Sequence, residues 1–197
     1  MTTKVNILID GGFFERKFIE TNNKVPTADD VIAETNKAMK ALIAKTNGDT
    51  KDILFRIFYY DCRPFGEIVK KSDGTDIDFS KSPIYKNKQL FFKTLGRKDK
   101  VALRLGELSF DGWKPDLHNP KKSKPDFKQK GVDMKVGLDM ACMATKHTID
   151  KIILIAGDSD FVAPIKFVRK EGLQVYLYPM NHKVNGILLE HCDFLLP

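Results

Sequence analysis

Short apolar runs that stop at an aspartate recur along this chain and alternate with stretches of helical periodicity. Val5–Ile9 leads into Asp10-Gly11-Gly12, and Lys151–Ala156 is followed by Gly157-Asp158. Runs of β-branched and aliphatic residues of this length are typical of strands buried on both faces of a sheet. Strands separated by helices lie parallel, because each crossover returns the chain to the same edge. We therefore predict an α/β fold with three layers, in which helices cover both faces of a mostly parallel sheet.

Local signals place the remaining elements. Thr27 and Asp30 are spaced as in a capping box, and a helix of about five turns is expected before Asn47-Gly48. Ser82-Pro83 supplies an N-cap and a first-turn proline for another helix. The expected strands are residues 5–9, 52–60, 151–156, 173–178 and 194–196, and the other expected helices are residues 13–20, 84–95, 132–147, 161–170 and 185–192.

Two segments lack this regularity. Residues 62–82 are polar and aperiodic, which indicates a variable surface loop that either borders a substrate site or is a tolerated insertion. Residues 101–113 alternate as in a strand or hairpin, and residues 112–131 form a basic loop with three prolines. That loop is either disordered and solvated or an electrostatic clamp. We expect residues 1–197 to form a single domain, with a basic insertion at about 101–131.

Composition narrows the classes of partner and compartment. The chain has 33 Lys and Arg against 26 Asp and Glu, a formal charge of +7, which favours polyanionic partners. Cys62, Cys142 and Cys192 are odd in number and widely spaced, so neither a disulfide framework nor a zinc site is expected. The chain starts without a signal-peptide pattern and has no apolar run of about 18 residues. We expect a cytoplasmic protein that does not span a membrane.

Aspartates cluster where the expected strands end. Asp10 closes the first strand, and Asp158 and Asp160 follow the strand at 151–156. Active sites of open parallel sheets lie beyond the carboxyl ends of the strands where the winding direction reverses, so these acids should converge if the two strands are neighbours. Carboxylates that meet at short range repel one another unless a cation lies between them. Mg²⁺ or Mn²⁺ is the natural ion for an all-oxygen site.

The helix expected from Val132 adds two more acids. At about 100° per residue, Asp133 and Asp139 border its apolar stripe, where an unpaired charge is costly. A metal site or a specific partner would remove that cost. The residues that define the stripe are Val132, Val136, Met140 and Met143.

Each acid also has a purely structural interpretation. Asp10 before Gly11-Gly12 could serve a turn, and Asp133 could be a helix N-terminal charge stabilised by the dipole. Asp158 or Asp160 could cap the following helix. Their joint occurrence at matching sheet edges favours a site.

Three segments resemble a known family. LIDGGFF at 8–14, KGVDMKVGLDM at 130–140 and LIAGDSDFVAPIKFVRKEGLQVYLY at 154–178 are similar to the hallmark segments of NYN domains, specifically of the LabA-like branch. The resemblance implies a PIN-like Rossmannoid fold and hydrolysis of RNA by acids that bind a divalent ion. Many relatives have an Asn shortly after the first acid, where this chain has Gly11-Gly12-Phe13. Carried onto this sequence, the catalytic and metal-binding acids are Asp10, Asp133, Asp158 and Asp160, with Asp139 as a further metal residue.

Basic and aromatic residues supply candidate RNA contacts. Trp113, Phe127 or Tyr60 could stack on bases, although aromatics at such places more often anchor a core or loop. Ser159 could contact a ligand or cap a helix. Lys135 could contact a phosphate or simply be solvated. The candidate RNA-binding lysines are Lys121, Lys122, Lys124, Lys128, Lys130 and Lys135.

The favoured function is that of a Mg²⁺- or Mn²⁺-dependent ribonuclease acting on single-stranded RNA, with endonucleolytic and exonucleolytic cleavage both left open. The alternative is a catalytically weak NYN-like module that binds RNA or a protein for regulation. A haloacid-dehalogenase-like phosphatase is disfavoured, because it needs an acid two residues after Asp10 and that residue is Gly12. A small-molecule-binding α/β domain would need a deep apolar pocket. A homodimer is left open.

Overall fold

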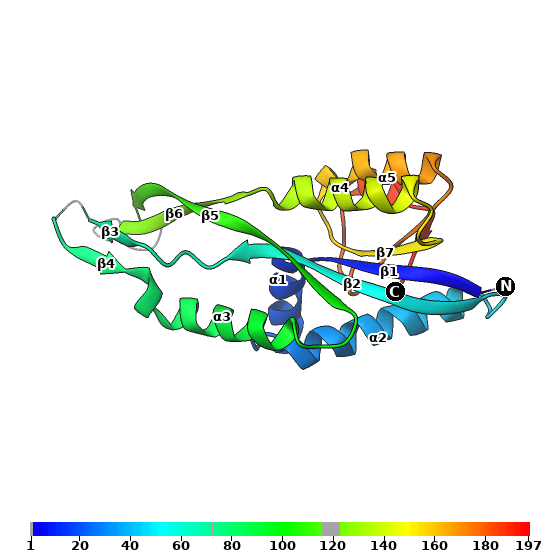
Figure 1. The fold of residues 1–197 in the computed structure, drawn as a ribbon, viewed down its shortest axis with the longest axis horizontal. Coiled ribbons are helices and arrows are strands. Elements are labelled where there is room, and N and C mark those ends of the chain that lie inside the picture. The colour runs from blue at the N-terminus through cyan, green and yellow to red at the C-terminus, as the bar shows by residue number, and fades with distance from the viewer. Residues whose placement is uncertain (1, 72, 116–122) are drawn as a thin grey trace.

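The computed structural model describes residues 2–71, 73–115 and 123–197 and contains a central sheet of seven strands. Their order across the sheet is β6-β5-β2-β1-β7-β8-β9, and every neighbouring pair is parallel except β5 and β6 (Figure 1). The strands are β1 (Thr2–Asp10), β2 (Lys51–Arg63), β5 (Val101–Pro115), β6 (Ser123–Lys130), β7 (Lys151–Ile155), β8 (Gln174–Leu177) and β9 (Phe194–Leu195).

Helices cover both faces of this sheet. One face carries α1 (Gly11–Asn22), α2 (Ala28–Lys45) and α3 (Pro83–Leu95), and the other carries α4 (Val132–Thr145), α5 (Val162–Lys170) and α6 (Gly186–His191) (Figure 1). Two buried cores follow, because alternate strand residues face opposite layers. Ile7 and Ile9 lie in the first core, whereas Leu8 lies in the second. The predicted three-layer α/β architecture is confirmed.

The capping signals at Thr27 and Ser82 act as expected, and Asp10 adds a helix cap that was not predicted. Asp10 and Ser82 are the N-caps of α1 and α3, and Thr27 forms the capping box of α2 with Asp30. Each cap satisfies backbone N–H groups that would otherwise lack a partner, which stabilises a helix by about 1 kcal/mol. The apolar stripe of α4 is buried as predicted, since Val136 and Met140 have almost no exposed surface. Among the described residues, no helix is long and apolar enough to cross a membrane.

The winding direction reverses between β1 and β7. The chain moves from β1 to β2 and β5 on one side, and α4 then carries it across to β7 on the other side of β1. Ile9 pairs with Ile155, so both strands end at the same level of the sheet. The condition for Asp10 and Asp158 to converge, that the first strand and the strand at 151–156 are neighbours, is therefore met.

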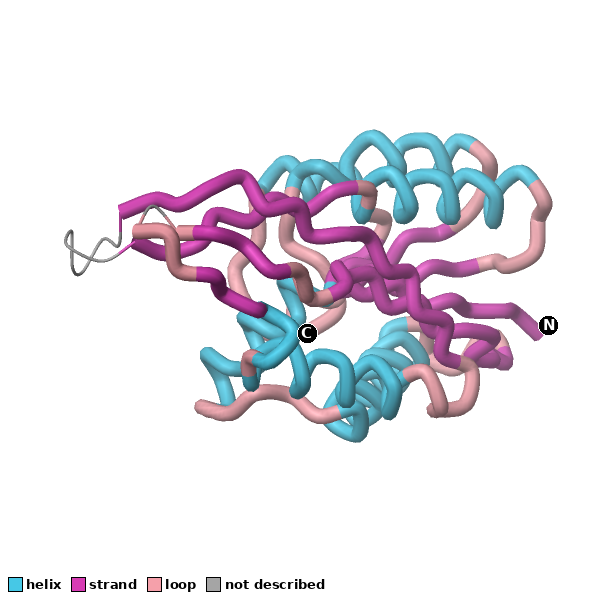
Figure 2. The backbone as a smooth tube through the Cα atoms, turned by 60° about the vertical axis from the view of Figure 1, so that its left-hand side comes forward, coloured by secondary structure: helices cyan, strands magenta, loops and turns pink. Residues whose placement is uncertain are grey.

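The two segments expected to be loops contain strands. Residues 62–82 hold a hairpin of β3 (Ile68–Lys70) and β4 (Asp76–Asp78), followed by the 3-10 helix η1 (Phe79–Lys81). The described residues of the expected basic loop at 112–131 belong mainly to the end of β5 and to β6, which pair antiparallel, and residues 116–122 lie outside the described part. Figure 2 shows these strands projecting beyond the helical layers.

Aromatic packing explains why this projection forms. Phe110 and Phe127 face each other across β5 and β6, and the indole Nε1 of Trp113 donates to the Lys70 carbonyl 3.0 Å away. Cross-strand aromatic pairs of this kind stabilise a hairpin by about 0.2–1 kcal/mol each. We define the aromatic cluster by the rings that contact one another here, namely Phe65, Phe79, Phe110, Trp113 and Phe127.

Candidate active site

The carboxyl ends of β1 and β7 position two aspartates beside each other. Asp10 is the last residue of β1 and caps α1, accepting the N–H groups of Gly12 and Phe13 at 3.0 and 3.2 Å on Oδ1. Asp158 lies just after β7 and caps the 3-10 helix η2 (Ser159–Phe161), accepting the N–H of Asp160 at 3.2 Å on Oδ1. The capping role considered for Asp158 is therefore present, whereas Asp10, considered as a turn residue, caps α1 instead. In each case no described residue donates to Oδ2, which leaves that oxygen available to a ligand.

Four of the predicted acids line one cavity. Its volume is about 270 Å³, and its wall includes Asp10, Asp133, Asp158 and Asp160. These residues come from β1, the first turn of α4, and the η2 segment, which are far apart in the sequence. We call this space the acidic cavity. The folded chain thus brings together the acids whose convergence the sequence predicted.

Burial dominates the electrostatics of Asp10. Removal from water raises the pKa of this carboxyl above its ordinary value, and the neighbouring charge of Asp61 adds to the rise. The backbone N–H groups of Phe13 and Gly12 and the charge of Arg16 act in the opposite direction. A cation in the acidic cavity would stabilise the ionised form of Asp10.

The donor set is suited to a hard divalent cation, because the acidic cavity offers several carboxylate oxygens and no thiol or imidazole. Within the described part of the chain, however, no three His, Cys, Asp or Glu side chains form a group already arranged to hold a metal. The residues fit a metal in their chemistry and in their shared cavity.

The fifth predicted acid is placed differently. Asp139 does not line the acidic cavity, and its carboxylate accepts hydrogen bonds from the Tyr60 hydroxyl at 3.0 Å and from Arg104 Nε at 2.6 Å. The structure does not bring Asp139 together with the other four. The free-energy cost of placing this charge beside the core stripe is offset by the hydrogen bonds from Arg104 and Tyr60 of the same chain.

Asp61 is an acid that the site hypothesis missed. It lies near the end of β2, is 7% exposed, and its Oδ2 lies 2.9 Å from Lys88 Nζ of α3. Lys88 also forms an ion pair with Glu15. Burial raises the pKa of Asp61 while the charge of Lys88 lowers it, and burial has the larger effect. The available signal was an acid after a β-prone run, the same signal that marked Asp10.

The candidate RNA-binding lysines are dispersed. Lys121 and Lys122 lie outside the described residues. On β6, Lys124 is half-buried, Lys130 is exposed, and Lys128 forms an ion pair with Asp111. Lys135 is half-buried on α4, and the β6 residue that lines the acidic cavity is Gln129.

Ser159 and the candidate stacking residues also have defined places. Ser159 lines a second cavity beside the acidic one, and its Oγ lies 3.5 Å from Asp158 Oδ1. Tyr60 is buried and lines the acidic cavity. Trp113 and Phe127 belong to the aromatic cluster, so their packing role is observed and base stacking stays a prediction.

Comparison with known proteins supports a relationship to one family. The family model of the NYN domain matches residues 112–196. This segment runs from the end of β5 to the end of the sheet and includes three of the four cavity acids, namely Asp133, Asp158 and Asp160. No curated protein matches the chain.

Proposed function

We propose that this protein is a nuclease of the LabA-like NYN type that hydrolyses single-stranded RNA with Mg²⁺ or Mn²⁺. The observation that carries the proposal is the convergence of Asp10, Asp133, Asp158 and Asp160 on one cavity at the switch point of the sheet. The NYN match over residues 112–196 supports a role related to RNA.

The four acids would hold the ion. When bound, a divalent ion supplies a polarised phosphoryl oxygen and a water of lowered pKa for in-line attack. The caps of Asp10 and Asp158 orient each carboxylate through Oδ1, so Oδ2 can face the cavity. Arg16, which also lines the acidic cavity, supplies a cation that can contact the RNA backbone beside the ion.

The test measures cleavage of a labelled single-stranded RNA by the wild type and by Asp10→Asn, with Mn²⁺, with Mg²⁺ and with EDTA. Asparagine caps helices about as well as aspartate, so this variant should keep the fold while it loses a charged ligand. We expect metal-dependent cleavage by the wild type and a loss of roughly 100-fold or more in the variant. Circular dichroism and Mn²⁺ binding followed by electron paramagnetic resonance separate loss of fold from loss of the metal.

A regulatory RNA-binding module is the second candidate, favoured by Gly11-Gly12-Phe13 at the place where many relatives have an Asn after the first acid. It predicts that the wild type binds the RNA but does not cut it under either metal. It also predicts that Asp10→Asn leaves RNA affinity unchanged or increases it, because a negative charge near the phosphates is lost. RNA binding by the wild type without cleavage under either metal would refute the nuclease proposal.

A further inference from the structure

We propose that a basic cavity beside the acidic one binds the RNA phosphate adjacent to the scissile phosphate, and that Arg16 and Lys183 are its cationic contacts. This inference rests on the proposed function, because it names how the same site would hold its substrate. It goes beyond it in naming the residues that contact the phosphate next to the cleaved bond.

The basic cavity lies beside the acidic cavity and shares part of its wall. Its volume is about 340 Å³, and the two spaces share Asp10, Phe13, Arg16 and Asp158 in their walls. Beyond this shared wall, its chemistry changes from carboxylates to cations and neutral polar groups. The residues specific to it are Lys17, Gly157, Ser159, Lys183, Val184 and Asn185.

Neighbouring elements position this second space at the same sheet edge. Arg16 lies on α1, directly after β1, and Lys183 lies in the segment after β8. The wall shared by the two cavities is tightly packed, since a Cβ on Gly157 would lie 2.4 Å from the Phe13 ring. Phe13 is 4% exposed, so the shared wall is fixed by the core.

Two of the cations in the basic cavity, Arg16 and Lys183, form no ion pair with a described residue. Lys17 forms an ion pair with Glu20, with its Nζ 2.7 Å from the carboxylate, so the charge of Lys17 is already paired. Within the part of the chain that the structure describes, no carboxylate forms an ion pair with Arg16 or Lys183, and both side chains are exposed. A guanidinium presents paired donors that match two phosphate oxygens, and an ammonium adds a point charge. Ser159 and Asn185 can supply neutral donors at the same place.

The charge pattern therefore matches two successive phosphates. The scissile phosphate would lie at the acidic cavity, where a metal offsets the carboxylates, and its neighbour would lie between Arg16 and Lys183. A linkage at the chain end that lacks this neighbouring phosphate should be cut more slowly. The direction of the RNA follows from which neighbour, 5′ or 3′, is required.

The experiment uses short single-stranded RNAs in which one phosphate at a time is replaced by an uncharged methylphosphonate. For each RNA, kcat/KM for cleavage with Mn²⁺ and Kd by fluorescence anisotropy are measured for the wild type and for Arg16→Ala/Lys183→Ala. For the wild type, kcat/KM should fall roughly tenfold or more when the phosphate on one side of the cleaved bond is neutralised. For Arg16→Ala/Lys183→Ala, kcat/KM on unmodified RNA should be lower than that of the wild type by a similar factor. It should fall little further on that modified RNA.

A control variant, Lys146→Ala/Lys170→Ala, removes the same two positive charges from exposed sites next to His147 and Glu171, which line a cavity at the opposite sheet edge. It should keep the wild-type response to every methylphosphonate. An equal response of wild type and Arg16→Ala/Lys183→Ala overturns the inference. RNA binding with the same one-sided pattern but without cleavage refutes the nuclease proposal alone, and absence of both binding and cleavage refutes both.

Discussion

Arg104 of β5 holds Asp139 of α4 through two guanidinium nitrogens, with Nε donating to Asp139 Oδ2 at 2.6 Å. The Tyr60 hydroxyl donates to the same carboxylate oxygen. Burial and the negative charge of Asp139 raise the pKa of Tyr60, so its hydroxyl stays a donor. Since Asp139 is only 12% exposed, this arrangement ties α4 to the sheet at the cost of burying one compensated charge.

Asp139→Asn should therefore affect stability, and Asp133→Asn should affect cleavage. Loss of the charged hydrogen bonds to Arg104 should lower the free energy of unfolding by about 1–2 kcal/mol, while metal-dependent cleavage changes little. Asp133 is exposed at the acidic cavity, so its substitution should leave stability nearly unchanged and remove most cleavage. Urea unfolding and RNA cleavage by the two variants check this. A fully stable but inactive Asp139→Asn protein would show instead that Asp139 belongs to the metal site.

Gly11 and Gly12 should respond oppositely to alanine. A Cβ on Gly11 would lie 2.7 Å from the Tyr60 carbonyl oxygen and 2.8 Å from a Tyr59 ring carbon, whereas a Cβ on Gly12 would lie 3.5 Å from its nearest neighbour, Asp10 Oδ1. Gly11→Ala should lower stability by about 1–3 kcal/mol or more through overpacking. Gly12→Ala should be neutral or stabilising, because alanine favours a helix. Thermal unfolding by circular dichroism measures both, and equal melting temperatures would contradict the packing shown.

The regular parts of the fold could be predicted because their signals are local. The capping box of Thr27 and Asp30, and the apolar run before Asp10, each lie within a few residues of the structure they specify. The neighbourhood of Asp10 and Asp158 followed from one general rule about where parallel sheets reverse their winding. That rule also requires β1 and β7 to be neighbours, which the sequence left as a condition and the order of strands in the sheet fulfils.

The missed features depend on contacts between distant residues. The partner of Asp139 is Arg104, and the partner of Asp61 is Lys88 on a helix that the sequence does not place beside β2. The aromatic cluster joins residues between 65 and 127, and the many lysines around it conceal strand alternation. The acids at the carboxyl ends of the strands could thus be predicted, whereas the cations that pair with Asp139 and Asp61 could not.

The three thiols should differ strongly in reactivity. Cys142 is exposed on α4, whereas Cys62 is 3% exposed and Cys192 is half-buried. Burial raises the pKa of Cys62, and burial together with the charge of Asp193 raises the pKa of Cys192 to about 11. At pH 8, iodoacetamide should modify Cys142 at least about tenfold faster than the other two, because the thiolate is the reactive form. Mass spectrometry of the peptides measures the rates, urea should equalise them, and rapid labelling of Cys62 in the folded protein would contradict the structure.

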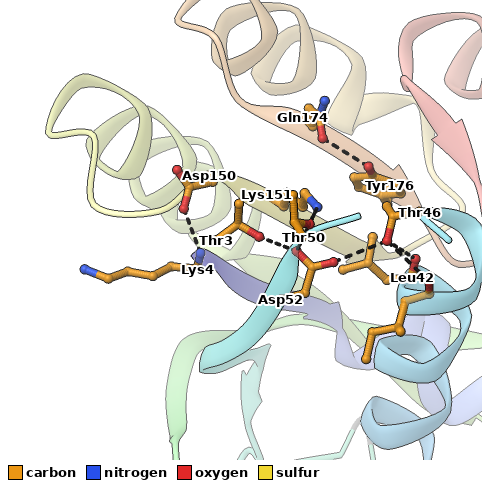
Figure 3. A network of polar contacts seen from close by, with 11 residues as sticks. Thr3, Lys4, Leu42, Thr46, Thr50, Asp52, Asp150, Lys151, Gln174 and Tyr176 are labelled. Carbon is orange, nitrogen blue, oxygen red and sulfur yellow. Dashed lines mark hydrogen bonds and ion pairs between the residues drawn. The ribbon is translucent and has the colours of Figure 1, made fainter. Parts of the chain in front are cut away.

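A buried ion pair stabilises the edge of the sheet opposite the acidic cavity. Lys151 Nζ lies 2.7 Å from Asp52 Oδ1, and the side chain of Asp52 has no exposed surface (Figure 3). Thr3 and Thr50 also donate to this carboxylate. Burial alone would raise the pKa of Asp52, but the hydrogen bonds from Lys151 and Thr3 outweigh it, and the pKa lies below the ordinary value of 3.8.

Lys151→Met should lower the free energy of unfolding at pH 7 by about 3–5 kcal/mol, because it leaves a buried carboxylate without its cation. A lowered pKa means that the stability Asp52 contributes is present above pH 3.8 and is lost as pH falls through the folded-state value. In the variant, the unpaired Asp52 should take up a proton more readily on folding. The gap between wild type and variant should therefore narrow as the pH falls from 7 toward 3.8 and below. Urea unfolding at several pH values measures this difference in the free energy of unfolding. Lys146→Met, at an exposed position, is a control that should change stability little. A difference independent of pH would show that the lost packing of the lysine, rather than the ion pair, causes the effect.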